Sequence, residues 1–283
     1  MEGASTVARQ IKISIITVSY NALKTIEQTI NSVVNQSYPN IEYIIIDGGS
    51  TDGTVDIIKK YKDKIAYWIS EPDGGIYDAM NKGIKVATGD YIQILGADDC
   101  MINEAVIADV VSDIKNKEAD LYCYGVIGVD ETALKEKYLG NHYVRNGNPK
   151  YTMIPHPGMF VKREMYLKFP FDTSYKIAAD YKFFLQCYLN DNVIFSYYDM
   201  PVVYFSLSGV SSKSVVLAEK ENLRIFKDLN ILSSGSVWFK VRCYVKILLL
   251  KIHMLSLIRK VSGGANWHKH RCENDLCRWC NKS

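Results

Sequence analysis

Short apolar runs and stretches with helical periodicity alternate through the first half of the sequence. Residues 11–19 and 41–46 are rich in Ile and other β-branched residues, and each run ends in a polar segment. Between them, Ile26, Ile30 and Val33 recur at the spacing of one helical face. A strand, a helix and a second strand in this order predict a βαβ unit with parallel strands.

The alternation continues along the chain. We expect helices at 54–61, 76–87 and 103–117 and strands at 66–70, 90–95 and 119–126. In the second half we expect a long loop at 130–149, a strand at 159–161, a helix at 178–189, two short strands within 193–206 and a helix at 215–229. This order predicts an α/β fold with a mostly parallel sheet and crossover helices, in which ligands bind beyond the carboxyl ends of the strands.

The composition is that of a globular protein. The 283 residues are 48% hydrophobic, and 34 Lys and Arg stand against 31 Asp and Glu, for a formal net charge of +3. Such a small surplus gives no reason to expect nucleic-acid binding, which needs Lys and Arg concentrated on one face. Residues 1–10 lack the apolar segment of a signal peptide, so we expect a cytoplasmic protein.

Residues 237–258 are rich in Leu, Ile and Val but are interrupted by basic residues, among them Arg242, Lys246 and Lys251. No uncharged apolar run reaches the roughly 18 residues that a membrane-spanning helix needs. We therefore expect a basic amphipathic helix over 233–262 that lies on the anionic inner face of the cell membrane. A helix packed against the main domain is the alternative, because apolar stripes on helices usually face a protein core.

The final segment, 263–283, contains His268 followed by Cys272, Cys277 and Cys280. Cys and His are zinc ligands, but this spacing matches no standard zinc finger, and little sequence surrounds it. We expect a reduced, disordered end here, with zinc binding as the alternative.

Acidic residues follow the ends of several expected strands. Asp47 comes directly after the strand at 41–46 and is followed by Gly48 and Gly49. A carboxylate there accepts hydrogen bonds from a base with an N–H donor edge, such as uracil or guanine, and glycines let the backbone approach a ligand. For Asp52, a few residues further on, a helix-capping role is the better interpretation.

Asp98 and Asp99 follow the strand at 90–95. Adjacent carboxylates at the end of a buried strand are hard oxygen ligands, suited to a Mg²⁺ or Mn²⁺ ion that also binds a diphosphate. Acid pairs are also common in surface turns, so this pair by itself is a weak signal.

The segment 71–83 opens a helix with an Asp-Gly-Gly loop and leaves Asp78 and Asn81 off its apolar face. Helix N-termini attract phosphate groups. A further acid, Asp180, stands at the start of an aromatic-rich helix, where it is either a helix cap or a functional carboxylate.

Taken in order, these segments resemble the inverting family 2 glycosyltransferases, which have the GT-A fold. The resemblance rests on Ser14-Ile15-Ile16-Thr17-Val18-Ser19-Tyr20-Asn21, residues 47–54, Asn81-Lys82-Gly83, Ala87-Thr88-Gly89-Asp90, Gly96-Ala97-Asp98-Asp99 and Ala178-Ala179-Asp180-Tyr181. It covers about residues 11–210, and the ordered set is more specific than any single motif. Residues 71–83 look like a bacterial subgroup associated with capsule, exopolysaccharide and lipopolysaccharide synthesis.

The resemblance implies roles for individual residues. Asp180 would be the general base, and Asp98 would coordinate Mg²⁺ or Mn²⁺ on the donor diphosphate. His156 resembles a His position of the subgroup and would contact the acceptor or the diphosphate, although a lone His is more often structural. The residues assigned to the nucleotide sugar are Val18, Tyr20, Asn21, Asp47, Asp78, Asn81 and Asp99.

One position departs from the family pattern. Gly96 stands where the Asp-x-Asp element of the family has its first acid. The departure removes the ribose or metal contact expected from that position, and Asp99 is the candidate to replace it.

The resemblance therefore implies an inverting glycosyltransferase of EC class 2.4. It would move a sugar from a nucleotide diphosphate sugar, with UDP as the favoured carrier, to a lipid-linked or growing surface-glycan acceptor. We expect the GT-A domain to span 11–232, with a nucleotide-sugar half at 11–128 and an acceptor half at 129–232, after an extension at 1–10. A nucleotidyltransferase and a catalytically silent glycan-binding scaffold are the alternatives, and release of free nucleoside diphosphate from a donor distinguishes the three.

Overall fold

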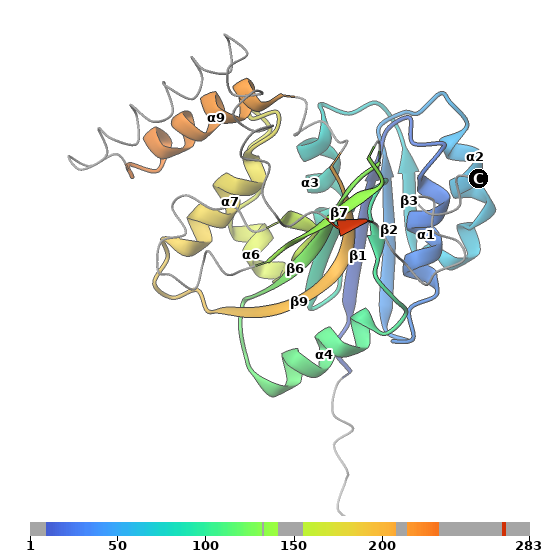
Figure 1. Ribbon diagram of the computed structural model, residues 1–283, viewed down its shortest axis with the longest axis horizontal. Helices are drawn as coiled ribbons and strands as arrows, with labels where there is room; N and C mark the ends of the chain where they lie inside the picture. Colours follow the sequence, from blue (N-terminus) through green and yellow to red (C-terminus); the bar gives the residue numbers. More distant parts are fainter. Residues whose placement is uncertain (1–9, 132, 141–154, 208–213, 232–267, 270–283) are drawn as a thin grey trace, which may run out of the picture.

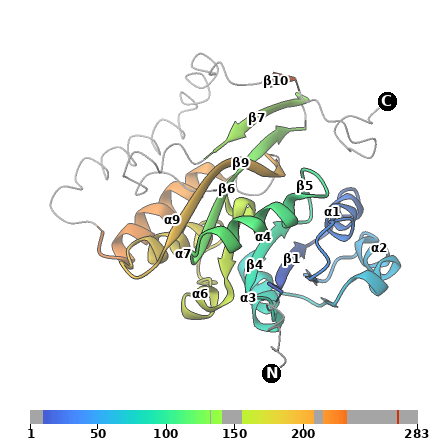
Figure 2. The same cartoon turned by 90° about the horizontal axis from the view of Figure 1, so that it is seen from below.

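The computed structural model describes residues 10–131, 133–140, 155–207, 214–231 and 268–269 (Figure 1). Within these residues, ten strands form one mixed sheet with helices on both faces (Figure 2). Strand order along the main path is β10-β7-β6-β8-β4-β1-β2-β3, and β9 pairs with β5 and β6. The helix expected over 233–262 and the cysteines at 272, 277 and 280 lie outside the described residues.

The first half of the sheet is parallel and confirms the predicted βαβ units. Its strands are β1 (Ile13–Ser19), β2 (Ile41–Asp47), β3 (Tyr67–Ser70) and β4 (Tyr91–Gly96), and all three of their pairings are parallel. The connecting helices are α1 (Ile26–Val34), α2 (Thr54–Lys60) and α3 (Ile76–Val86), with a short 3₁₀ turn η1 (Lys62–Lys64) after α2.

The second half of the sheet is largely antiparallel. Its elements are β5 (Cys100–Met101), α4 (Val106–Asn116), β6 (Leu121–Asp130), β7 (Lys135–Leu139), η3 (His156–Gly158), β8 (Met159–Lys162), α6 (Arg163–Lys168), α7 (Ala179–Tyr188), β9 (Phe195–Ser206) and α9 (Val215–Asp228). β8 pairs antiparallel with β4 and with β6, so this short strand joins the two halves. The sheet is therefore mixed, and its parallel part lies within residues 11–128, for which we predicted a nucleotide-sugar half.

Three expectations for the second half were wrong. Residues 193–206 contain one long strand, β9, which pairs parallel with β6 through a β-bulge, and not two short strands. The predicted loop at 130–149 contains β7, which forms a hairpin with β6. His268 and Lys269 form β10 beside β7, so the tail is not disordered at these two residues. Among the described residues, no helix is both long enough and apolar enough to cross a membrane.

The two faces of the sheet carry separate hydrophobic cores, because side chains alternate along each strand. On one face, Ile13, Ile15 and Ile45 pack with α1, α2 and α4. On the other, Ile16 and Ile46 pack with α3, α6, α7 and α9. Figure 2 shows α1 and α2 on one side of the strands and α3, α6 and α7 on the other. The strands are thus held rigidly from both sides, and their ends are fixed.

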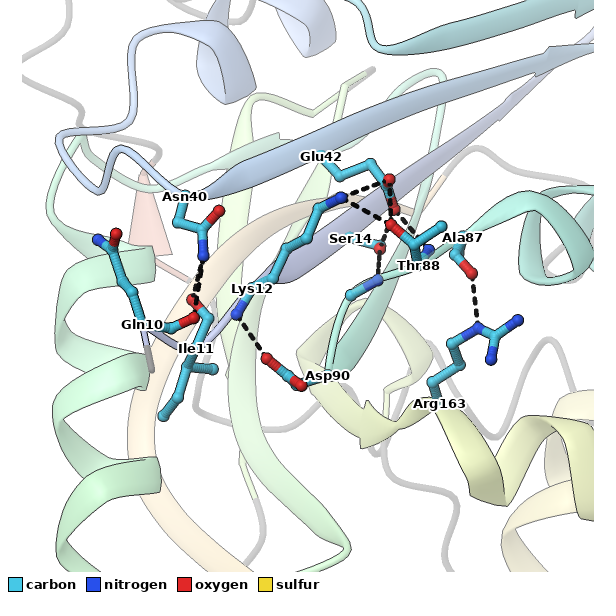
Figure 3. A network of polar contacts seen from close by, with 11 residues as sticks. Gln10, Ile11, Lys12, Ser14, Asn40, Glu42, Ala87, Thr88, Asp90 and Arg163 are labelled. Atoms are coloured by element: carbon cyan, nitrogen blue, oxygen red, sulfur yellow. Dashed lines mark hydrogen bonds and ion pairs between the residues drawn. The ribbon is translucent and has the colours of Figure 1, made fainter. Parts of the chain in front are cut away.

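A polar network ties the amino-terminal ends of the strands together (Figure 3). Glu42 on β2 accepts hydrogen bonds from Lys12 Nζ (2.8 Å), Ser14 Oγ (2.6 Å) and the Thr88 backbone N–H (2.7 Å). Burial opposes ionisation of Glu42, but these donors outweigh it and lower its pKa to about 2. The Lys12 N–H also donates to Asp90. The Ala87-Thr88-Gly89-Asp90 motif therefore stabilises the edge of the sheet opposite to the expected ligand site.

We expect Glu42→Gln to lower the free energy of unfolding at pH 7 by about 3 kcal/mol, the value that corresponds to lowering this pKa from 4.5 to about 2. Because the native pKa is depressed, the contribution is present above pH 4.5 and is lost as the pH falls toward 2. Urea titrations at several pH values measure it. Glu118→Gln is the control, because that exposed carboxylate has only a 3.5 Å ion pair with Lys162. Equal stability losses for the two variants would contradict the assignment.

Candidate active site

The candidate site lies at the carboxyl ends of the parallel strands. In the strand register, Ser19 stands beside Asp47, and Val18 stands beside both Ile46 and Gly96. The loops that follow β1, β2, β3 and β4 therefore leave the sheet at one edge. This is the edge at which open α/β sheets bind ligands.

Asp47 is fully buried at this edge and is surrounded by donors. The hydroxyls of Ser19, Ser50 and Ser70 each donate to its carboxylate at 2.6 Å. The backbone N–H groups of Gly49 (3.2 Å) and Ser50 (2.8 Å) also donate to it. Burial disfavours the charged form, but the hydroxyl donors outweigh burial, and the pKa of Asp47 lies below its ordinary value.

These contacts define what Asp47 does in the structure. A carboxylate offers about four lone-pair sites, and the loop occupies them. Asp47 therefore joins β1, β2 and β3 and fixes the loop at 48–53. Direct contact between Asp47 and a nucleotide base, which remains a prediction, requires one of these hydrogen bonds to open.

Asn21 and Asp52 tie the first loop to the second. Asn21 has a φ of 48° and accepts a hydrogen bond from the Thr51 N–H through its side chain (3.0 Å). Asp52 accepts hydrogen bonds from the Leu23 N–H (3.0 Å) and from the Thr54 N–H (3.0 Å) at the start of α2. Asp52 thus fixes the turn before α2, but the N-cap residue of that helix is Gly53 and not Asp52; Asn21 has a structural role as well.

Tyr20 and Asp73, which lies in the loop after β3, are the side chains nearest to Gly48. Tyr20 is 68% exposed, and its ring approaches within 3.4 Å of the position that a Cβ on Gly48 would occupy. The Asp73 carboxylate comes within 2.6 Å of the same position, so a side chain at residue 48 would displace the end of the Asp73 side chain. An exposed aromatic ring beside a backbone without side chains suits stacking of a planar base. Val18, in contrast, is buried in the sheet below.

Asp78 contributes to the same loop. Its Oδ2 accepts a hydrogen bond from the Gly74 N–H (3.0 Å) and lies 3.5 Å from Lys82 Nζ. Lys82 also pairs with Glu71 at 2.8 Å. The hydrogen bond from Gly74 lowers the pKa of Asp78, so the residue is a carboxylate that holds the entrance to α3.

Asp98 and Asp99 differ in environment. Asp99 is buried, and its carboxylate accepts hydrogen bonds from the Gly96 N–H (2.8 Å) and, on β9, from the Ser206 N–H (3.4 Å). Asp98 is half-buried, and its Oδ1 lies 2.7 Å from where a Cβ on Gly96 would be. A side chain at residue 96 would therefore displace the end of the Asp98 side chain.

The donor set at Asp98 fits a divalent ion that is shared with a substrate. The described residues contain no group of three or more His, Cys, Asp or Glu side chains that would enclose a metal. Mg²⁺ is often bound by one or two carboxylates with the remaining positions filled by substrate phosphates and water. Asp98 at the end of β4 meets that requirement, and Asp99 orients the turn that carries it.

Asp180 stands in the first turn of α7 and is half-buried. Its Oδ1 accepts hydrogen bonds from the Tyr77 hydroxyl (3.0 Å) and from the Tyr181 N–H (2.9 Å). Burial raises the pKa of Asp180 to about 6, the two donors oppose this rise, and the negative charge of Glu221 adds to it. The helix begins after Ala178, and no side chain caps it, so Asp180 is not the N-cap residue.

Asn81 and His156 both contact Phe171, which precedes α7 in the chain. Asn81 Nδ2 donates to the Phe171 carbonyl (2.8 Å), and its Oδ1 accepts from the Phe171 N–H (3.1 Å). The His156 ring packs edge-on against Phe171 at 5.7 Å. Burial lowers the pKa of His156 to about 4, and neither ring nitrogen has a hydrogen-bond partner within the described parts of the chain. Asn81 therefore positions the chain before α7, and His156 is neutral.

Sequence reasoning missed several residues at this site. Tyr77 and Glu221 carried no distinctive signal, because Tyr on an apolar helix face is usually a core residue and an acid on a helix is usually solvated. Asp73 was noted only as part of the Asp-Gly-Gly loop. Asp47 ends β2, Asp98 follows β4 at the same edge of the sheet, and Asp180 in the first turn of α7 is joined to α3 by the Tyr77 hydroxyl.

Comparisons with known proteins agree with this geometry. The family described as Glycosyl transferase family 2 matches residues 14–177, and the chain belongs to this family. The chain is therefore a nucleotide-sugar-dependent glycosyltransferase.

An uncharacterized glycosyltransferase of Mycobacterium tuberculosis is 34% identical over 189 residues, which cover 62% of this chain and 69% of the relative. A PGL/p-HBAD biosynthesis glycosyltransferase of Mycobacterium bovis is 26% identical over 262 residues, 91% of this chain and 98% of the relative.

Solved structures show the same fold. Staphylococcus aureus TarS 1-349 in complex with UDP-GlcNAc matches with a TM-score of 0.63 and 23% identity over 78% of this chain and 66% of that one. The chain spans 39% of the longer TarS structure. A mannosyltransferase from Pyrobaculum calidifontis in complex with GDP-Man and Mn²⁺ matches with a TM-score of 0.63 and 16% identity, over 86% of this chain and 70% of that one.

We expect Asp47→Asn to weaken UDP binding by about 10- to 100-fold in the absence of divalent ions, because a buried charge-assisted network contributes roughly 1.5–3 kcal/mol per hydrogen bond. The loop at 48–53 would lose its fixed shape. Calorimetric titration with UDP measures the loss. Asp56→Asn is the control, since that side chain is exposed on α2 with only a 3.5 Å ion pair. Wild-type affinity in a folded Asp47→Asn protein would contradict this role.

Proposed function

We propose that this chain is an inverting glycosyltransferase that takes a sugar from a nucleotide diphosphate sugar, with UDP as the favoured carrier. The acceptor is a lipid-linked or growing surface glycan. The observation that carries the proposal is Asp180: a single half-buried carboxyl with a pKa raised by burial to about 6. A general base with a pKa just below the working pH is ionised and still basic enough to take a proton.

Inversion proceeds in one displacement. The acceptor hydroxyl oxygen attacks the anomeric carbon, its proton passes to Asp180, and the bond from the anomeric carbon to the diphosphate oxygen breaks. The new bond forms on the face opposite to the departing diphosphate. One base is sufficient for this reaction, in contrast to retention, which needs a second displacement.

On the donor side, the exposed ring of Tyr20 stacks on the base, and the loop fixed by Asp47 and Asn21 binds the nucleoside. Asp78, Asn81 and Asp99 act indirectly, because their side chains hydrogen-bond to the backbone of the loops and turns at the site. Their proposed contribution to nucleotide-sugar binding is therefore to keep these loops in place.

Asp98 would hold Mg²⁺ or Mn²⁺ at the donor diphosphate. A bound divalent ion neutralises the negative charge that develops on the departing diphosphate. Support comes from the half-buried Asp98 carboxylate at the end of β4 and from the Mn²⁺ named with GDP-Man in the mannosyltransferase structure.

The nature of the acceptor is supported by the relatives. One is named for PGL/p-HBAD biosynthesis and another is a poly(ribitol-phosphate) beta-N-acetylglucosaminyltransferase. We propose that the segment at 233–262 lies on the membrane and brings the enzyme to such an acceptor. Membership in the family disfavours a nucleotidyltransferase, and the variant described next distinguishes an active enzyme from a silent scaffold.

We expect Asp180→Asn to lower sugar transfer by about 10²- to 10⁴-fold with donor affinity unchanged, because the amide cannot accept the proton. Wild-type turnover should rise with pH through about 6, since the carboxyl must lose its proton to act as a base. A steady-state assay of nucleotide diphosphate release from pH 5 to 9, with donor binding measured by calorimetry, tests both expectations. Asp191→Asn, an exposed acid after α7, is the control. Near-normal turnover of folded Asp180→Asn would leave the base unassigned.

We expect Asp98→Ala to abolish the increase in UDP affinity that Mn²⁺ produces and to leave metal-free UDP binding nearly unchanged. The diphosphate charge is no longer compensated when the carboxylate is lost. Thermal shift with UDP, with and without Mn²⁺, reads this out as a loss of the metal-dependent rise in melting temperature. Asp109→Ala, an exposed change on α4, serves as the control. An unaltered Mn²⁺ effect would refute the assignment of Asp98.

A further inference from the structure

Tyr77 reaches the proposed base from a different part of the fold. It lies in the first turn of α3, is 5% exposed, and packs its ring against Phe171 at a centroid distance of 5.5 Å. Its hydroxyl donates to Asp180 Oδ1 at 3.0 Å, across 103 residues of sequence. The family assignment and the sequence patterns gave this residue no role.

The hydrogen bonds at Asp180 are unequal between its two oxygens. Oδ1 accepts from Tyr77 and from the Tyr181 N–H. Within the described parts of the chain, the two hydrogen bonds that other residues donate to this carboxyl both fall on Oδ1, and the backbone N–H of Asp180 itself also favours its charged form. Two donors on one oxygen restrict rotation of the carboxyl group and leave the other oxygen as the proton acceptor.

We propose that Tyr77 is a positioning residue for the glycosyl transfer: its hydroxyl orients the Asp180 carboxyl and joins it to the donor-binding loop. This inference rests on the proposed function, because it assumes that Asp180 is the base. Tyr77 acts through Asp180 and not on the substrate.

The link to the donor side runs through α3. Tyr77 follows the Asp73-Gly74-Gly75 loop, and the Asp73 carboxylate in that loop lies over Gly48. One turn further along the same helix, Asn81 holds the Phe171 backbone through two hydrogen bonds. The start of α3 therefore contacts the loop at Gly48 through Asp73. It also contacts Phe171 through Asn81 and Asp180 through Tyr77. Displacement of the loop at 73–75 would move the hydroxyl that holds the base.

Three titratable groups face the Asp180 carboxyl from the surrounding helices: Tyr77 on α3, Tyr166 on α6 and Glu221 on α9. Glu221 is buried and accepts hydrogen bonds from three consecutive N–H groups, of Lys176 (2.8 Å), Ile177 (3.0 Å) and Ala178 (3.0 Å). Its charge raises the pKa of Asp180, whereas the Tyr77 hydrogen bond lowers it. Tyr166 is fully buried, and its hydroxyl has no hydrogen-bond partner in the part of the chain that the structure describes.

Tyr77→Phe and Tyr166→Phe form a matched pair for the test. Both rings pack against Phe171 at 5.5 Å, and each substitution removes one buried hydroxyl. Only the Tyr77 hydroxyl contacts Asp180. In Tyr77→Phe we expect the acidic limb of the kcat profile to move up by about one pH unit, because a hydrogen bond to a charged group is lost. We expect kcat at the alkaline plateau to fall about 10-fold through loss of orientation, with the KM for donor unchanged. Tyr166→Phe should leave both parameters at the wild-type values.

A direct titration separates this inference from the proposed function. Carbon-13 NMR of the Asp carboxyls, with Asp180→Asn to assign the signal, should show the Asp180 pKa rising in Tyr77→Phe and unchanged in Tyr166→Phe. Failure of the base assignment would appear as normal turnover in Asp180→Asn. If Asp180→Asn is inactive but Tyr77→Phe leaves the pH profile and the NMR titration unmoved, the role of Tyr77 is refuted and the base stands. Equal effects of the two Tyr variants would also refute it, because they would reflect packing alone.

Discussion

The hydrogen bonds to the buried Asp47 carboxylate are the interaction on which the rest of the site depends. Three hydroxyls, from the ends of β1 and β3 and from the loop after β2, converge on this one charge. Burying a carboxylate without partners is strongly unfavourable, so these donors must arrive together when the strands pair. Correct register of β1, β2 and β3 is thus a condition for satisfying Asp47. The conformation of the loop at 48–53 therefore depends on that register.

The segment before α7 is stabilised in a different way, by side chains that hydrogen-bond to its backbone. The segment before α7 has little regular structure, yet its backbone is bound from two sides: by Asn81 on α3 and by Glu221 on α9. Tyr175 in this segment also donates to Asp228 on α9 at 2.6 Å. These contacts support a carboxyl, Asp180, whose raised pKa marks a cost to folding. Since the native pKa lies above the unfolded value, that cost is absent below pH 3.8 and complete above about 6, and the surrounding hydrogen bonds offset it.

The sequence predicted the parallel half well, because the 2.0- and 3.6-residue periods there are regular and each crossover is short. The second half was harder. β9 contains Asp199 and Pro201 within one strand, and its bulge beside Gly125 interrupts the alternation, so a single strand looked like two. β7 is rich in Lys and Glu because it lies near the edge of the sheet, where charged residues are common.

For the site residues, too, part could be predicted from the sequence and part could not. Asp98, Asp180 and Asp47 were proposed as functional acids from their places in the motifs. Which carboxylates are already used by the protein could not come from the sequence, because their donors, such as Ser70 and Ser206, are far away along the chain. Asp99 and Asn81 turned out to bond the backbone of the site. Tyr77 was missed because its hydroxyl has a partner 103 residues away, while its ring belongs to the core.

Two carboxyl groups, Glu42 and Asp180, therefore have opposite effects on the stability of the fold. At the amino-terminal edge, Glu42 is paired with Lys12 and hydrogen-bonded until its pKa falls to about 2, so its charge stabilises the fold. In the acceptor half, Asp180 is desolvated until its pKa rises to about 6, so its charge destabilises the fold and makes the group basic. The ion pair and hydrogen bonds of Glu42 stabilise the fold, whereas desolvation of the Asp180 carboxylate destabilises it. The Ala87-Thr88-Gly89-Asp90 motif thus stabilises the strands at the end opposite to the candidate site.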